Sequence, residues 1–551
     1  MNTIEKRRGN RKHGIKNRAI EWSFYSDRIY GEPFSEIELD VLFTDPEGKG
    51  HRVPAFWRGG EQWSVRFSPS MIGLYQYRTI CTDVSNEGLH NIKGELMVED
   101  YSGNNPLYRH GAIRVAEERK HFEHADGTPF FWLADSWWGG NVKRFRWPED
   151  FQLLTADRLE KGFTVIQIFA GFPPLLDMFD ERGANEAGFP WEEDLSSINP
   201  EYFEMMDLRI QHLVDRGLVP CIYSGAGFNL LKLGLEKTKQ YWRYLIARWG
   251  AYPVMWCACG EGDLPWFHSK TKDEDRKALK DGWTETIGYM RSIDAHHRLV
   301  TIHPHPMAGS AREVVHKPEL LDFDILQTGH FHRRSLVKTV NLIKESVQAA
   351  PQMPVLNGEV CYEEVFQNSP PIHQRFLFWA CVLSGAVAGH SYGAAGLWQF
   401  NTEDVKAGTS PHEGGINWSE TPWNVAYKYP GSGQLGYSKD LLMDYPWWRI
   451  ESHFEWVEPH WDQEKYEMPV AGGIPGELRI IYFPPDNILP IVHGIESGIS
   501  YTGFFFNPID GEKHDLGVIE ADSKGNWQIP APPVMQDWVV VLEAVNSEKP
   551  S

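Results

Sequence analysis

The pattern of hydrophobic and polar positions divides the chain into three stretches. Between about residues 20 and 110 apolar and polar positions alternate, and turns containing Gly or Pro separate the alternating segments. Alternation with a period of two, interrupted by turns, predicts an antiparallel β-sandwich with one buried face, to which Ile37, Leu39, Val41 and Phe43 are expected to point. The same pattern returns from about residue 460 to 551, in segments such as LRIIYF and DWVVVLEAV, and predicts a second sandwich.

The middle stretch, from about residue 118 to 455, has a different texture. Short apolar runs alternate with longer segments in which apolar residues recur at helical spacing. The clearest helix is predicted over 201–216, where Asn199 can cap the amino end, Pro200 suits the first turn and Gly217 ends the apolar stripe. Alternating strands and helices of this kind are typical of an α/β fold.

Eight apolar runs in this stretch are candidate strands. They are FFWLADS (130–136), FTVIQIFA (163–170), VPCIYSG (219–225), VMWCACGEG (254–262), RLVTIHP (298–304), FDILQTGH (323–330), PVLNGEV (354–360) and GAVAGHSYG (385–393). Eight parallel strands buried on both sides predict a (β/α)₈ TIM barrel. Functional residues of such a barrel lie at the carboxyl ends of its strands, so the candidates are Asp135, Tyr223, Glu261, His303, His305, His330, Glu359, His390 and Tyr392.

These patterns predict the organisation of the whole chain. We expect a basic N-terminal arm over 1–18, a β-sandwich over 19–112, the catalytic barrel over 113–455 and a second sandwich over 456–551. The first residues are basic but lack the apolar core of a secretory signal, and no run of about 18 apolar residues predicts a membrane span. The expected location is therefore cytoplasmic.

Composition and charge narrow the range of partners. Hydrophobic residues make up 42% of the chain and charged residues 23%, as in a well-packed globular protein, and the formal net charge is -21. An acidic surface repels nucleic acid and anionic membranes, so neither is expected as a partner, whereas a small carbohydrate fits. Aromatic residues make up 13% of the chain, which suits stacking against sugar rings but also an aromatic-rich core. The sequence leaves a homo-oligomer open.

The cysteines do not indicate a metal site. The chain has six, at positions 81, 221, 257, 259, 361 and 381, mostly inside apolar segments that are far apart in sequence. Free buried thiols in a reducing compartment are expected. The CAC motif at 257–259 lacks a second Cys or His pair at ligand spacing, so it is not a zinc knuckle. We therefore predict no metal and no cofactor.

Two carboxylates stand out among the candidates. Glu261 is expected at the end of the fourth strand and Glu359 at the end of the seventh, where both would face the mouth of the barrel. Retaining glycoside hydrolysis uses such a pair, because one carboxylic acid protonates the leaving oxygen while the other carboxylate attacks the anomeric carbon. The nearby acids Asp263, Glu363 and Glu364 are expected to be loop charges.

Several motifs resemble bacterial glycoside hydrolases of the apiosidase-like group. They are HFEHADGTPFFWLADSWW, WCACGEGD, NGEVCYEE, the front segment EWSFYSDRIYGEPFSEIELDVLFTDPEGKGHRVPAFW, and the closing NPIDGE and WQIPAPPVMQDWVVVLE. The resemblance covers nearly the whole chain and implies an N-terminal β-sandwich of the DUF5060 kind, a DUF4038-type barrel and a small C-terminal β-domain. It also implies an acid after strand four and a Glu after strand seven, matching Glu261 and Glu359.

The chain departs from the family at strand four. Where the family often has an Asp after two glycines, this sequence has Cys259, Gly260 and Glu261. Many related retaining barrels have an Asn before the acid, and its side chain bonds the sugar 2-hydroxyl. Gly260 cannot make that bond, so either another group makes it or the substrate does not require it.

The remaining pocket residues are expected to bind sugar. Asp135 can grip hydroxyls while Trp137 and Trp138 stack on a ring, although a capped loop over a Trp-rich core explains them equally. Barrel metallohydrolases carry a His-x-His pair on strand one, where this chain has LADSWW, so we interpret the histidines as partners of sugar hydroxyls. Tyr362 and Trp398 are candidate walls, or packing residues. With them, the predicted binding set comprises Asp135, Trp137, Trp138, Tyr223, His303, His305, His330, Tyr362, His390, Tyr392 and Trp398.

The sequence favours one function over two others. We expect a retaining, exo-acting glycoside hydrolase that cleaves short oligosaccharides or glycosides, with Glu359 as nucleophile and Glu261 as acid and base. One alternative is a metal-dependent amide or ester hydrolase on the same barrel, which the missing ligands on strand one disfavour. The other is a carbohydrate-binding protein without catalysis.

Overall fold

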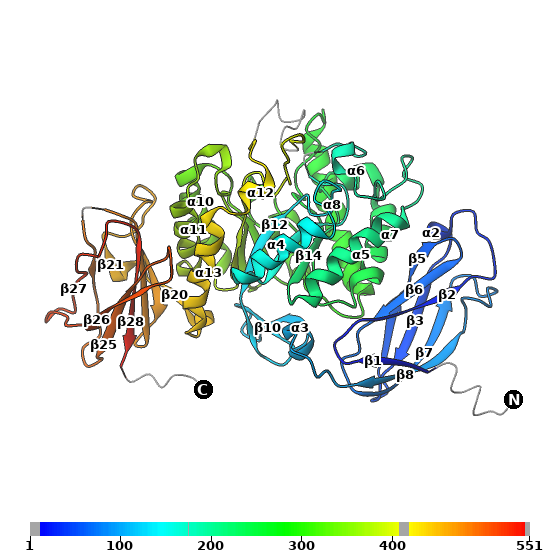
Figure 1. Cartoon of the computed structure of the whole chain (residues 1–551), viewed down its shortest axis with the longest axis horizontal. Helices are drawn as coiled ribbons and strands as arrows, with labels where there is room; N and C mark the ends of the chain where they lie inside the picture. The colour runs from blue at the N-terminus through cyan, green and yellow to red at the C-terminus, as the bar shows by residue number, and fades with distance from the viewer. Residues whose placement is uncertain (1–10, 175, 407–417, 487, 546–551) are drawn as a thin grey trace.

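The computed structural model describes residues 11–174, 176–406, 418–486 and 488–545. The chain forms three parts in a row, with a central α/β barrel between an N-terminal and a C-terminal β-sandwich (Figure 1). Each part buries apolar side chains of its own, and the cluster inside and around the barrel is by far the largest. Within the described residues, no helix is both long and apolar enough to cross a membrane.

The N-terminal part consists of two packed sheets. The five-stranded sheet has the order β1-β8-β7-β3-β4, and the three-stranded sheet has the order β2-β6-β5. Their bounds are β1 Arg11–Ile15, β2 Ile20–Tyr25, β3 Leu39–Thr44, β4 Gly50–Pro54, β5 Phe56–Gly59, β6 Gln62–Phe67, β7 Gly73–Cys81 and β8 Lys93–Glu99, with the short helix α2 at Pro33–Glu36. The apolar positions Ile37, Leu39, Val41 and Phe43 are all buried, as the alternation predicts.

The start of the chain differs from the expected arm over 1–18. Residues 1–10 lie outside the described residues. Residues 11–15 form strand β1, which pairs in parallel with β8 at the edge of the five-stranded sheet. The basic character of this segment does not prevent pairing, because its charged side chains remain exposed while Gly14 is covered. This segment is therefore part of the sandwich.

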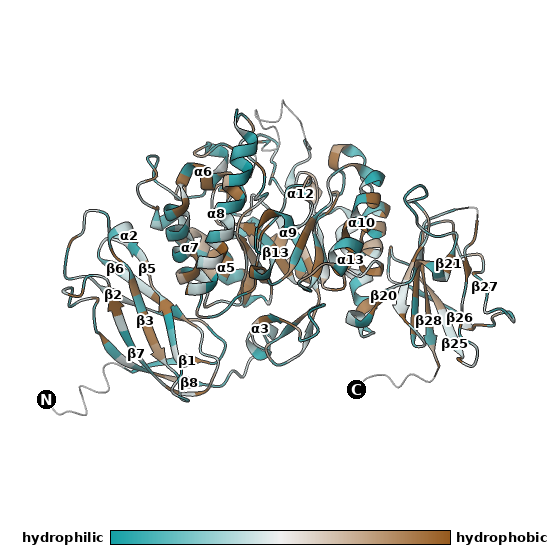
Figure 2. Cartoon of the chain, turned by 180° about the vertical axis from the view of Figure 1, so that it is seen from behind, coloured by the Kyte–Doolittle hydropathy of each residue, from teal (hydrophilic) through white to brown (hydrophobic). Residues whose placement is uncertain are grey.

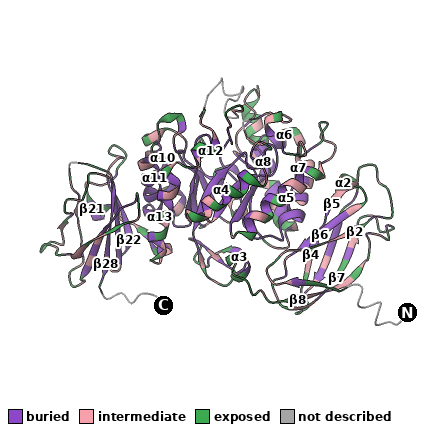
Figure 3. Ribbon diagram, viewed as in Figure 1, coloured by how far each residue is buried: buried purple, intermediate pink, exposed green. Residues whose placement is uncertain are grey.

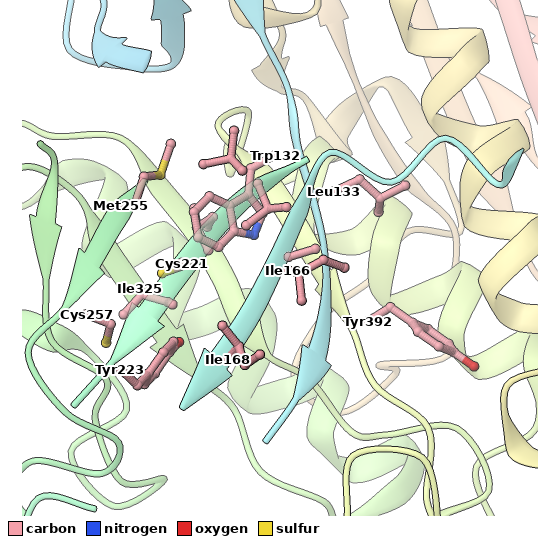
Figure 4. Close-up of a cluster of buried hydrophobic side chains, with 14 of the residues drawn as sticks. Trp132, Leu133, Ile166, Ile168, Cys221, Tyr223, Met255, Cys257, Ile325 and Tyr392 are labelled. Atoms are coloured by element: carbon pink, nitrogen blue, oxygen red, sulfur yellow. The ribbon is translucent and has the colours of Figure 1, made fainter. Parts of the chain in front are cut away.

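The barrel contains all eight predicted strands. They are β12 Trp132–Trp137, β13 Val165–Phe169, β14 Val219–Tyr223, β15 Met255–Cys257, β16 Val300–Thr301, β17 Asp324–Gln327, β18 Val355–Glu359 and β19 Gly389–Tyr392. All are parallel to their neighbours, in the order β16-β15-β14-β13-β12-β19-β18-β17. Since β16 and β17 do not pair, the barrel is nearly but not fully closed. Figure 3 shows these strands buried, and Figure 4 shows apolar side chains that pack around them.

Helices cover the outside of the barrel. They are α4 Glu149–Glu160, α5 Pro200–Asp215, α6 Asn229–Leu233, α7 Leu235–Trp249, α8 Lys272–Ile293, α9 Ala311–Val314, α10 Ser335–Gln348, α11 Pro371–Leu383, α12 Trp423–Ala426 and α13 Pro430–Met443. Figure 2 shows hydrophobic residues concentrated in the strands, while the outer helices carry hydrophilic stretches. Such two-sided burial explains why the strands are continuous apolar runs.

Helix α5 confirms the helix predicted over 201–216. The side chain of Asn199 accepts a hydrogen bond from the backbone N–H of Glu201, and Pro200 occupies the first turn. Gly217 follows the helix with a φ of 89°, a left-handed conformation that suits glycine. These local signals determine both ends of the helix.

A small sheet closes the amino end of the barrel. It consists of β9 Ile113–Val115, β10 Phe122–His124 and β11 Pro129–Phe130, preceded by the short helix α3 at Pro106–Arg109. Phe122 packs against Trp132 and Phe323, which lie at the starts of strands β12 and β17. This packing covers the end of the barrel opposite the carboxyl ends of the strands.

The C-terminal part is again a pair of sheets. A six-stranded sheet has the order β20-β22-β23-β28-β25-β26, and a three-stranded sheet has the order β21-β24-β27. The bounds are β20 Glu451–Ser452, β21 Val457–Glu458, β22 Val470–Ile474, β23 Leu478–Phe483, β24 Ile491–Val492, β25 Tyr501–Phe506, β26 Lys513–Val518, β27 Trp527–Gln528 and β28 Trp538–Ala544. Arg375 on α11 makes two hydrogen bonds to the buried carboxylate of Asp537, which joins this domain to the barrel.

Candidate active site

A cavity opens at the carboxyl ends of the barrel strands. Residues that follow each of the eight strands line it, so the wall encircles the cavity. The predicted site residues that it brings together are Trp138, Tyr223, Glu261, His303, His305, His330, Glu359, Tyr362 and Trp398. Both candidate acids therefore face the same space, together with three histidines and four aromatic side chains.

Glu359 is the last residue of β18, as predicted, and two imidazoles hold its carboxylate. Nε2 of His330 lies 3.0 Å from Oε1 of Glu359, and Nε2 of His303 lies 3.2 Å from Oε2. Burial by itself would raise the pKa of Glu359, but the two imidazoles outweigh it and lower this pKa to about 2. Glu359 is therefore an anion at neutral pH.

His330 is oriented by both of its ring nitrogens. Nδ1 faces the backbone N–H of Tyr362 at 3.4 Å, while Nε2 faces the carboxylate of Glu359. Burial would lower the pKa of His330, but its contacts with Cys361 and Glu359 raise it to about 9. With Nδ1 accepting from Tyr362, the proton on Nε2 points at Glu359 and stabilises its buried negative charge.

The sequence predicts that Glu261 ends strand β15, but the structure places it beyond the strand. The strand ends at Cys257, and Glu261 lies in the following loop with a φ of 49°. Hydrogen bonds hold this loop on both sides, from Gly260 N–H to the Gly225 carbonyl at 2.9 Å and from Gly262 N–H to the His303 carbonyl at 2.8 Å. A left-handed conformation at a non-glycine residue is uncommon and is often found at functional sites.

The glycine before Glu261 has a steric cause. A Cβ atom at Gly260 would lie 2.6 Å from Cζ of Phe169, whose ring lines the cavity. No side chain fits there unless that ring moves. The space that a side chain at position 260 would need is therefore occupied by an aromatic wall from strand β13.

The aromatic wall is held by hydrogen bonds and ring contacts. Trp138 Nε1 donates to the Tyr362 hydroxyl at 2.7 Å, and Tyr223 donates its hydroxyl proton to Oε1 of Gln167 at 2.6 Å. The rings of Trp138 and Tyr223 meet edge to face with centroids 5.0 Å apart. Such pre-oriented aromatic surfaces suit the apolar faces of sugar rings.

The remaining predicted residues do not line this cavity. Asp135 is fully buried, where it accepts hydrogen bonds from Arg158 Nε at 2.6 Å and Trp137 Nε1 at 2.8 Å. Trp137 packs against Phe151, Phe145 and Phe400. The prediction that Asp135 and Trp137 contact substrate is thus corrected, because successive residues of a strand point to opposite sides and these two point outward, toward α4.

His390 and Tyr392 on β19 are corrected for the same reason. His390 packs against Phe378 of α11, and burial lowers its pKa to about 3, so it is a neutral core residue. Tyr392 donates its hydroxyl proton to the buried carboxylate of Glu363. Glu363 is accordingly not a loop charge, and burial raises its pKa to about 7.

Sequence reasoning missed several lining residues. They include Phe169, Phe228, Phe267, Gln327 and Trp418. A polar residue inside an otherwise apolar strand run is a signal that could have identified Gln327. The aromatic residues carried no such signal, because core packing explains them equally well.

The described residues contain no group of three or more His, Cys, Asp or Glu side chains that is placed to hold a metal ion. His303 and His330 both face Glu359, and the backbone N–H of His305 donates to Asp263 at 2.7 Å. All six cysteines are buried and free. The polar side chains that line the cavity include an acid pair, three imidazoles, one amide and two tyrosines.

Family models match two parts of the chain. The model described as "Apiosidase-like, catalytic domain" matches residues 116–449, more than half of the chain, and "Domain of unknown function (DUF5060)" matches residues 16–82. Among curated protein sequences, none matches this chain.

Solved structures share the fold. A glycoside hydrolase family 5 structure from Bacteroides vulgatus ATCC 8482 has a TM-score of 0.66 at 20% identity and covers 82% of this chain and 97% of its own. A second structure from that organism, titled as a candidate glycoside hydrolase, has a TM-score of 0.67 at 17% identity over 97% of this chain and 100% of its own. A third, titled "Glycoside hydrolase", has a TM-score of 0.63 at 20% identity and covers 81% of this chain and all of its own.

Proposed function

This chain belongs to the family of apiosidase-like catalytic domains, and on that basis we propose that it is a glycoside hydrolase that cleaves with retention of anomeric configuration. The observation that carries the proposal is the pairing of an ionised, imidazole-held Glu359 with Glu261 across one aromatic-lined cavity. Glu359 serves as the nucleophile and Glu261 as the acid and then the base.

The environment of Glu359 supports its role as nucleophile. A nucleophilic carboxylate must be ionised before substrate arrives, and the pKa of Glu359, lowered to about 2, ensures this throughout the neutral range. Its two oxygens face different imidazoles, so the carboxylate is held in one orientation. This pre-orientation reduces the reorganisation that attack on the sugar requires.

Glu261 has the position of a proton donor and acceptor. It lies on a different loop from Glu359, lines the same cavity and is partly exposed, so a leaving group and later a water molecule can reach it. In the proposed mechanism, Glu261 gives a proton to the leaving oxygen and later takes one from water.

The reaction has two steps. In the first, an oxygen of Glu359 bonds to the anomeric carbon while the glycosidic bond breaks, and the leaving oxygen takes the proton of Glu261. In the second, Glu261 removes a proton from water, whose oxygen bonds to the anomeric carbon as the bond to Glu359 breaks. Two inversions at one carbon restore its original configuration.

The shape of the cavity supports exo action on short substrates. Residues after all eight strands contribute to its wall, which accommodates the end of a glycan better than a chain that passes through. We therefore propose that the substrates are short oligosaccharides or glycosides whose terminal sugar enters the cavity.

The experiment that tests this function uses aryl glycosides. A panel of 4-nitrophenyl furanosides and pyranosides of both anomers is incubated with the enzyme, and proton NMR follows the first sugar released from the best substrate. We expect the product to keep the substrate's anomeric configuration. An inverted product would show that the two acids do not act by double displacement, and release by Glu359→Ala at the wild-type rate would exclude Glu359.

A further inference from the structure

Gln327 ends strand β17 directly beside Glu359. The register pairs Leu326 with Asn357 and Gln327 with Glu359, so the pairing shifts by one residue and leaves Gly358 unpaired. A Cβ atom at Gly358 would lie 2.1 Å from Cγ1 of Ile325, so this irregularity depends on glycine. Bulges of this kind re-aim side chains next to active sites. Here the bulge places Gln327 and Glu359 next to each other at the mouth of the barrel.

The side chain of Gln327 has one unused end. Its Nε2 lies 3.4 Å from Oε1 of Glu261, and the residue lines the cavity although it is only 2% exposed. Its carbonyl oxygen, Oε1, is buried and has no hydrogen-bond partner in the part of the chain that the structure describes. Buried carbonyl oxygens in native proteins nearly always have a partner. The cavity, where substrate is expected, can supply the missing donor.

Gln167, a second buried glutamine near the cavity, has hydrogen-bond partners at both ends of its amide. Gln167 donates from Nε2 to the Gly358 carbonyl at 3.0 Å and to Ser136 at 3.2 Å. Its Oε1 accepts from the hydroxyl of Tyr223. Gln167 has therefore used both ends of its amide within the protein, whereas Gln327 retains an acceptor for a ligand.

The position of Gln327 identifies the part of the sugar that it meets. Under the proposed function, Glu359 attacks the anomeric carbon and Glu261 protonates the leaving oxygen. A side chain that contacts Glu261 and stands beside Glu359 lies at that carbon, and the nearest sugar hydroxyl belongs to the adjacent ring carbon. Hydrogen bonds to this 2-hydroxyl strengthen in the transition state of glycoside hydrolysis.

We propose that Gln327 recognises the 2-hydroxyl of the bound sugar by accepting its hydrogen bond through Oε1. This inference rests on the proposed glycosidase function and deepens it by naming the substrate class: sugars with a free hydroxyl next to the anomeric carbon. It also supplies the contact that Gly260 cannot make, from strand β17 in place of the loop after β15.

The test compares two substrates in two variants. The 4-nitrophenyl glycoside that the wild type cleaves fastest is paired with its 2-deoxy counterpart, and kcat/KM is measured for both. Gln327→Met keeps the volume of the side chain but removes the acceptor. It should therefore lower the ratio of kcat/KM for the glycoside to kcat/KM for its 2-deoxy counterpart by at least about tenfold. Gln327→Glu keeps an acceptor oxygen at the same place and should retain a ratio close to that of the wild type.

The substrate pair distinguishes recognition from structural support. Equal losses on both substrates in Gln327→Met, or an unchanged ratio, would overturn the role in 2-hydroxyl recognition. If Gln327→Met does not fold, as judged by its melting curve, Gln327→Asn provides the comparison. Its side chain is one methylene shorter, so the acceptor oxygen lies farther from the sugar. A wild type that cleaves no glycoside in the panel would instead refute the proposed function, and the role of Gln327 with it.

Discussion

At the residue scale, the two acids have separate roles that their substitution should reveal. Replacing Glu359 with Ala removes the nucleophile, and replacing Glu261 with Ala removes the proton donor, so each variant should lose about 10²–10⁴-fold or more in kcat. Glu261 lies in a partly exposed loop, so its loss should change the melting temperature little, whereas loss of the buried Glu359 leaves His303 and His330 without their partner and should lower it more. Activity within tenfold of the wild type in either variant would remove that residue from the mechanism.

The imidazole of His330 should determine the acid side of the pH profile. Because contact with His330 lowers the pKa of Glu359, His330→Asn should raise that pKa. Attack requires ionised Glu359, so the acidic limb of kcat/KM should move to higher pH in the variant. The measurement is the profile of kcat/KM against pH, with His316→Asn as control, since His316 is exposed and pairs with Asp281 away from the cavity. An acidic limb that stays in place would separate His330 from the ionisation of Glu359.

At the scale of elements, strand β18 positions its terminal carboxylate through a close backbone contact. Gly358→Ala would press a methyl group against Ile325, so it should destabilise the protein by about 1–3 kcal/mol and displace Glu359, with loss of activity. The matched control is Gly288→Ala in α8, where an added Cβ meets no atom within 4 Å. This variant should stabilise the protein by about 0.5–1 kcal/mol, because alanine favours the helix. Urea unfolding and turnover test both; equal effects would contradict the steric argument.

At the scale of the whole molecule, buried charges join the N-terminal sandwich to the barrel. The carboxylate of Asp207 on α5 accepts hydrogen bonds from Arg66 on β6 and from Arg248 on α7. Burial by itself would raise the pKa of Asp207, but the two guanidinium groups outweigh it and lower this pKa well below its usual value. The stability that the ionised carboxylate contributes is present above about pH 4 and is lost as the pH falls below that value.

Removing this shared carboxylate should weaken the whole assembly. Asp207→Asn removes the buried carboxylate that Arg66 and Arg248 share, leaves them only their half-exposed partners Glu21 and Glu204, and should lower the free energy of unfolding by about 3–5 kcal/mol. Glu95→Gln is the control, because Glu95 pairs with Arg11 at the surface of the same sandwich and should contribute about 1 kcal/mol or less. Chemical unfolding of both variants at neutral pH compares them. A loss of similar size in both would mean that the buried cluster adds nothing to the union of the two domains.

The sequence by itself determined the architecture and the position of one of the two proposed catalytic acids. The eight barrel strands, the two flanking sandwiches and the ends of helix α5 were predictable, because period-two alternation, continuous apolar runs and capping residues are local signals. The position of Glu359 followed as well, since a single carboxylate ends the apolar run of β18. Residues 11–15 were misjudged, because pairing at a sheet edge depends on a partner strand that lies far away in sequence.

Only the tertiary structure decided which side chains face the cavity. Asp135, Trp137, His390 and Tyr392 come from the correct strands, but a strand presents neighbouring residues to opposite sides, and the ends of β12 and β19 could not be located to one residue from the pattern. The left-handed turn at Glu261, the two imidazoles on Glu359 and the bulge beside Gln327 all depend on contacts between distant loops. The physical reason is that hydrophobic periodicity specifies which residues are buried, whereas the direction and partners of a polar side chain depend on packing that only the closed barrel supplies.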